Sequence, residues 1–154
     1  MYRHKTGYLK MKIKNYKVTL LTAIILLLGV NSCSKKETPV PYSSINFTID
    51  LDLPQYSKLQ TPDNWLYVTG GINGLIIFNT GNGTSNPFVV FDRTCTYNPS
   101  NGYVKVNSNN VYATDSTCGS VFNIINGGVQ HSPATVPLKQ YNCTFDGVNL
   151  TVTN

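Results

Sequence analysis

Residues 140–152 read Gln-Tyr-Asn-Cys-Thr-Phe-Asp-Gly-Val-Asn-Leu-Thr-Val. Apolar and polar side chains alternate on both sides of Asp146-Gly147, a pair that favours the tight turn of a β-hairpin. The pattern predicts two antiparallel strands, over 140–145 and 149–152. Because side chains two positions apart share a strand face, Cys143 should lie between Tyr141 and Phe145 as a buried, reduced thiol.

The same signals continue through residues 45–154. Short apolar or alternating runs are separated by glycine- and asparagine-rich turns, and no window carries capped apolar residues at helical spacing. Further strands are expected over 45–49, 66–68, 75–78, 88–91, 103–107, 109–113 and 121–125. The predicted fold class is all-β: one antiparallel sandwich or barrel, since this length supports one modest core and not two.

The positive charge of the chain is concentrated at its start. Six of the 12 Lys and Arg residues precede residue 18, whereas from Cys33 onward six basic residues stand against seven acidic ones. Residues 18–30 form a 13-residue apolar run, shorter than the roughly 20 residues of a membrane-spanning helix. The pattern is typical of a secretion signal over 1–32, with Met11 as an alternative start, and it argues against a nucleic-acid partner.

The signal ends in Val30-Asn31-Ser32-Cys33, which fits a lipobox. We therefore expect Cys33 to be lipidated and residues 33–44, polar and proline-containing, to form a tether. Ser34-Lys35-Lys36-Glu37 resembles the charged patch that follows the lipidated cysteine in surface lipoproteins of Bacteroidetes. The expected location is the bacterial cell envelope, at the outer membrane on its periplasmic or surface face, with an envelope protein as a further partner.

Residues 88–141 resemble the Rieske 2Fe–2S domain. A strand leads into Cys95-Thr96-Tyr97, and after seventeen residues comes Asp115-Ser-Thr-Cys118-Gly-Ser120. Later matches, in order, are Phe122, Pro133-Ala134, Pro137-Leu138 and Tyr141. The resemblance implies a Rieske-like fold for residues 45–154.

The ligand positions of that family are degenerate in this chain. They read Cys95, Tyr97, Asp115 and Cys118, so only the first matches. A Rieske centre needs two thiolates and two imidazoles, whereas His131 is the sole histidine after Cys33 and lies outside both loops. We therefore expect no cluster, no other cofactor and no metal.

The resemblance also places Cys95 and Cys118 on two loops that meet over the cluster. Without a cluster, the expectation is a disulfide between them, which an exported location permits and which would contribute about 3 kcal/mol. An atypical iron–sulfur or mononuclear metal centre at the four positions is the alternative, and a redox-active dithiol is a third reading.

The expected function follows from this site. We expect a non-enzymatic structural or binding module. The alternative is an electron-transfer or metal-binding lipoprotein, or a subunit of a redox assembly.

Overall fold

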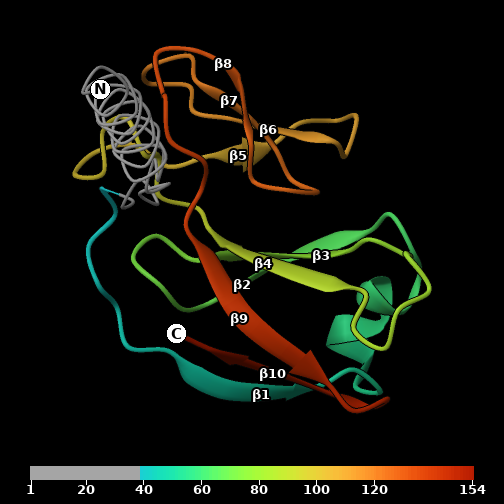
Figure 1. Cartoon of the computed structure of the whole chain (residues 1–154). Helices are drawn as coiled ribbons and strands as arrows, with labels where there is room; N and C mark the ends of the chain where they lie inside the picture. Colours follow the sequence, from blue (N-terminus) through green and yellow to red (C-terminus); the bar gives the residue numbers. More distant parts are fainter. Residues whose placement is uncertain (1–38) are drawn as a thin grey trace, which may run out of the picture. The chain divides into compact units, whose positions relative to one another are not determined.

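The predicted hairpin lies at the centre of the larger of two sheets. In the computed structural model, which describes residues 39–154, β9 (Gln140–Phe145) pairs with β10 (Asn149–Thr153) in antiparallel register, with Leu150 opposite Phe145 and Val152 opposite Cys143 (Figure 1). The signal over 1–32, Cys33 and the first part of the tether lie outside the described residues.

The larger sheet has six antiparallel strands in the order β1-β10-β9-β4-β3-β2. Its other members are β1 (Asn46–Asp50), β2 (Trp65–Val68), β3 (Leu75–Asn79) and β4 (Phe88–Asp92). The first and last strands of the domain pair with each other, so the hairpin joins the start of the domain to its middle strands (Figure 1).

The smaller sheet is an insertion between β4 and β9. Its strands, in the order β5-β6-β7-β8, are β5 (Lys105–Val106), β6 (Tyr112–Thr114), β7 (Val121–Asn123) and β8 (Val129–His131) (Figure 1). Every pairing in both sheets is antiparallel, which confirms the predicted all-β fold class. Strand β8 was not predicted, and β5 is shorter than the expected run.

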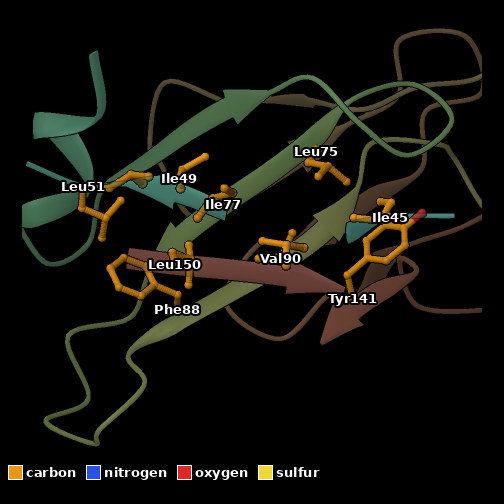
Figure 2. Close-up of a cluster of buried hydrophobic side chains, with 11 residues drawn as sticks. Ile45, Ile49, Leu51, Leu75, Ile77, Phe88, Val90, Tyr141 and Leu150 are labelled. Carbon is orange, nitrogen blue, oxygen red and sulfur yellow. The ribbon is translucent and has the colours of Figure 1, made fainter. Parts of the chain in front are cut away.

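Strands β3 and β4 are buried on both faces and separate two apolar clusters. Ile77 and Val90 point into the first cluster, which contains Tyr141 and Leu150 from the hairpin (Figure 2). Phe91 belongs to the second cluster, which contains buried residues of the insertion. Because successive side chains of β3 and β4 point to opposite faces, these two strands contact both clusters and so connect the larger sheet to the insertion that carries Cys95 and Cys118.

One short helix departs from the predicted pattern. The 3₁₀ helix η1 (Pro54–Gln60) follows β1 and places Leu59, which is fully buried, on the first cluster. Its proline occupies the first turn, where the missing N–H removes no intrahelical bond. Within residues 39–154 no helix is long and apolar enough to cross a bilayer.

The last residues of the predicted tether contact the β domain. Val40, assigned to the tether, is buried, and the carbonyl oxygen of Ser43 accepts a hydrogen bond of 2.7 Å from Asn154 Nδ2. The hydroxyl of Ser43 donates to the carbonyl of Gly71 at 3.3 Å. The end of the predicted tether is thus packed on the domain.

Candidate functional site

The first of the two site loops follows β4 and carries Cys95. Thr94 pairs with Tyr103 in an isolated bridge, and the Cys95 N–H donates to the Gly102 carbonyl at 3.0 Å. A Cβ atom on Gly102 would overlap the Asp115 carboxylate and lie 2.8 Å from Cys95 Cβ. Gly102 therefore permits the close approach of the two loops.

The second loop joins β6 to β7 and carries Asp115 and Cys118. The Asp115 N–H donates to the Ser120 carbonyl at 2.9 Å, and the Gly119 N–H donates to the Asp115 carbonyl at 2.8 Å. The Asp115 carboxylate also accepts the Thr117 N–H at 2.8 Å. These bonds close a tight turn that directs the carboxylate and the thiol to the same side.

Three of the four residues singled out from the sequence come together. The Sγ atoms of Cys95 and Cys118 are 3.6 Å apart, and Cys118 Sγ lies 3.4 Å from Asp115 Oδ2. The ligand atoms of all three residues lie within 4.8 Å of one another. Cys95 and Asp115 are buried, whereas Cys118 is partly exposed. Of the three residues, Cys118 is therefore the one that reaches solvent.

The expected disulfide is not formed in this structure. A disulfide requires an S–S distance of about 2.05 Å, and at 3.6 Å the two sulfurs are in contact as free thiols. Cys143 is also a free thiol; it is half-buried against the first cluster and donates to the Phe88 carbonyl at 3.3 Å. The bond between Cys95 and Cys118 stays a prediction.

The two remaining candidate ligands lie outside this group. The Tyr97 side chain is 57% exposed and forms no hydrogen bond with any residue of 39–154, while its backbone N–H points to the Cys95 sulfur. His131 is exposed at the end of β8 and is not part of the three-residue group. Neither side chain extends the donor set.

The Cys95 thiol and the Asp115 carboxylate shift each other's pKa in opposite directions. Burial, together with a hydrogen bond to Asp115, raises the pKa of Cys95 to about 12. Burial alone would raise the pKa of Asp115, but hydrogen bonds from Cys95, from the Thr117 N–H and from Cys118 more than offset it and hold that pKa below its usual value. At neutral pH, Cys95 is therefore a thiol that donates to an ionised carboxylate.

Ser120 is a site residue that the sequence reasoning did not assign. Its buried hydroxyl accepts the Ala134 N–H at 2.9 Å and lies 3.1 Å from Cys118 Sγ. The hydroxyl thereby links the cysteine loop to the proline-containing segment before β9. The match of Gly119-Ser120 to the Rieske motif could have pointed to this residue. The motif alone does not predict the two hydrogen bonds of the Ser120 hydroxyl.

A Rieske cluster does not fit these donors. Its second iron needs two imidazoles, and the group offers two thiols and one carboxylate. A single ion is a different case, because tetrahedral zinc accepts thiolate and carboxylate ligands with water in a fourth position. Two sulfurs bound to such an ion at about 2.3 Å would lie about 3.8 Å apart, and the observed distance is 3.6 Å.

The structure of this chain is similar to solved structures of ferredoxins. The ferredoxin of carbazole 1,9a-dioxygenase from Nocardioides aromaticivorans IC177 is 13% identical, with 73% of this chain and 98% of that chain covered and a TM-score of 0.46. A chain in the complex of reduced oxygenase and oxidized ferredoxin of carbazole 1,9a-dioxygenase is 23% identical, with 60% and 82% covered and a TM-score of 0.42.

The Sphingomonas yanoikuyae B1 ferredoxin is 18% identical, with 63% of this chain and 93% of that chain covered and a TM-score of 0.42. No family model and no curated protein matches the chain. We therefore base the proposed function on the geometry of the site.

Proposed function

We propose that the chain is a lipoprotein of the bacterial cell envelope whose β domain is a non-enzymatic structural or binding module. Its anchor is lipidated Cys33, at the outer membrane, and its partners are the membrane and an envelope protein. The basic leader, the short apolar run and the lipobox support this assignment. Because Ser43 is already hydrogen-bonded to the domain, the ten residues from Cys33 span at most about 36 Å, which keeps the domain near the membrane.

The anchor is tested by replacing its cysteine. Cys33→Ala should stop incorporation of labelled fatty acid and release the chain from the membrane fraction, whereas Cys143→Ala should change neither. A Cys33→Ala chain that is still acylated and still sediments with membranes would show that the anchor is elsewhere.

The site within this module favours one metal ion held by Cys95, Cys118 and Asp115. The observation that carries this assignment is the 3.6 Å separation of the two sulfurs beside a buried carboxylate. The Asp115 carboxylate is held towards the two sulfurs by hydrogen bonds from Cys95, Cys118 and the Thr117 N–H, so the three donors already face one another. An ion in the centre would take the place of the thiol protons between them, and its binding would displace the Cys95 proton.

Metal content and colour test this proposal directly. The full chain should contain about one equivalent of zinc or a similar ion per molecule and should be colourless. Cys95→Ser and Cys118→Ser should lose the ion, whereas Cys143→Ser, at the thiol outside the group, should retain it. A brown protein with visible absorption would instead favour the electron-transfer alternative and an atypical iron–sulfur centre.

A disulfide between the same two cysteines is the second candidate. The sulfur contact and the oxidising location expected for an exported protein favour it. In that case peptide mapping without reduction should recover Cys95 and Cys118 in one linked pair, and Cys95→Ser should lower the free energy of unfolding by about 2–4 kcal/mol without changing the metal content. Free thiols together with bound metal would exclude the disulfide.

A further inference from the structure

A cavity of about 390 Å³ lies beside the turn that joins β2 to β3. It is lined by residues 67–72, Gly74 and Arg93. It shares no residue with the three-residue group formed by Cys95, Asp115 and Cys118. Its volume is at the small end of the range of ligand-binding cavities, so an occupant would be a small molecule or one residue of a larger one.

The guanidinium of Arg93 is fixed in the wall of this cavity. Its Cζ atom lies 3.9 Å from the centre of the Tyr67 ring and 5.1 Å from the centre of the Tyr103 ring. Its Nε donates to the Val104 carbonyl at 3.2 Å. Tyr67 is itself held, because its hydroxyl accepts the Val106 N–H at 2.8 Å. The contacts with the two rings and the Nε hydrogen bond hold the guanidinium without using its outer N–H groups.

Both Nη groups of Arg93 are available to a ligand. Neither forms a hydrogen bond or an ion pair with residues 39–154, where every buried side-chain nitrogen has a partner, so both Nη atoms are open to solvent. Two parallel N–H donors on a rigid plane match the two oxygens of a carboxylate. The lining holds no other charged residue, which indicates a ligand with a single acidic group there.

The rest of the lining is a rigid turn of mostly small residues. The buried Asp92 carboxylate accepts the Ile72 N–H at 2.9 Å and also the Thr94 N–H and the Tyr141 hydroxyl. A side chain at Gly71 would overlap that carboxylate, so the wall consists of backbone at this point. Backbone groups and the Thr69 hydroxyl offer hydrogen bonds to a hydroxylated ligand body.

We propose that this cavity binds the carboxylate of a small hydroxylated acid, with Arg93 as its bidentate partner. A hexuronate, free or as a residue of a glycan, has this chemistry: one carboxylate on a ring that carries hydroxyl groups. Neutral hexoses lack the group that Arg93 recognises. The site is independent of the metal centre and of its proposed function.

Titration calorimetry with the full chain in detergent tests the proposal, with glucuronate, an oligoglucuronate and glucose as probes. At least one of the two uronate probes should bind and glucose should not. Binding of free glucuronate identifies the free acid as sufficient, whereas binding of the oligomer alone identifies the glycan as the source. Arg93→Gln should weaken binding about tenfold or more, and Arg93→Lys should restore only part of it because lysine lacks the fork.

Lys105→Gln is the matched control, since Lys105 contacts the Tyr103 ring but does not line the cavity; it should change the affinity less than twofold. If Arg93→Gln unfolds, Ile72→Glu replaces it, because Ile72 is 40% exposed in the lining and a second carboxylate there should repel the ligand. Failure of both uronates to bind the wild-type chain, equal binding of glucose, or unchanged affinity in the folded variants would overturn the proposal.

Discussion

The larger sheet and the insertion are held together in different ways. In the larger sheet, strands of four to six residues pair continuously over the first apolar cluster. In the insertion, strands of two or three residues are joined by turns that side chains such as Asp115 close onto the backbone. Burial of apolar side chains between long strands holds the first region together, and the second region carries the thiols and the carboxylate of the three-residue group.

The largest expected effect comes from shortening one buried isoleucine in each region to alanine, which creates a cavity there. Ile77 in β3 and Ile124 in the insertion are both fully buried. Ile77→Ala should lower the free energy of unfolding by about 3–4 kcal/mol and Ile124→Ala by about 2–3 kcal/mol, because the longer paired strands around Ile77 relax less around the cavity. Denaturant unfolding at neutral pH measures both.

Metal content separates the two variants further. Ile77→Ala should leave the metal content of the folded chain unchanged, whereas Ile124→Ala, in the same cluster as Cys95 and Cys118, should reduce it. Equal losses of stability together with equal metal content would mean that the two regions do not differ in the way described.

The next effect concerns the junction of the regions, at the end of β4. The buried Asp92 carboxylate accepts hydrogen bonds from Ile72, Thr94 and Tyr141. Asp92→Ala leaves these donors without an acceptor and should cost about 2–3 kcal/mol of unfolding free energy. Asp50→Ala, at the exposed bond to the Asp52 N–H, is the control and should cost well under about 1 kcal/mol. Similar urea midpoints of unfolding for Asp92→Ala and Asp50→Ala would contradict this expectation.

The sequence predicted the larger sheet better than the insertion. Strand β9 has the predicted bounds, and β3 and β4 differ from their predicted runs by one residue, because long apolar or alternating runs carry a strong periodic signal. Strand β8 was missed: its three residues are mostly exposed and carry no alternation. Short strands depend on their neighbours and leave little trace in the sequence.

The site was predicted in part, for a related physical reason. The resemblance singled out Cys95, Asp115 and Cys118, which do meet, but it gave Tyr97 equal weight although its side chain is exposed. The disulfide placed first from the sequence stays a prediction, and the contact of the Asp115 carboxylate with the two cysteines could not be seen from the sequence. That contact depends on the missing side chain at Gly102. The Arg93 cavity was not foreseen, since its walls come from distant segments.

A smaller effect should appear as pH dependence in the reduced, metal-free chain. Burial and the hydrogen bond to Asp115 raise the pKa of Cys95 from 9.0 to about 12. A raised pKa in the folded state means that the stabilisation by the protonated Cys95 thiol is complete below pH 9 and is lost progressively as the pH rises towards 12. Cys95→Ala should therefore flatten the alkaline fall of the unfolding free energy.

Cys143 provides the comparison in the larger sheet. Burial raises the pKa of Cys143 as well, while a hydrogen bond from Asn86 lowers it. Cys143→Ala should flatten the alkaline fall less than Cys95→Ala does, because only Cys95 donates its proton to a neighbouring carboxylate. Chemical unfolding between pH 7 and pH 11 distinguishes them; identical profiles for the two variants would remove the special role of Asp115.

The smallest expected effect on stability comes from replacing one glycine with a positive φ in each region by alanine. Gly147 in the β9–β10 turn and Gly119 in the site loop have φ values of +106° and +79°, and a Cβ atom on either would meet nothing within 4 Å. Alanine at each should thus cost about 1 kcal/mol through backbone strain alone. The two variants should differ in the site: only Gly119→Ala moves Cys118 relative to Asp115, so only that variant should lose metal or, if the disulfide is present, form it more slowly. A loss of metal in Gly147→Ala at equal stability would show that the hairpin controls the geometry of the site, and the two regions would then act as one unit.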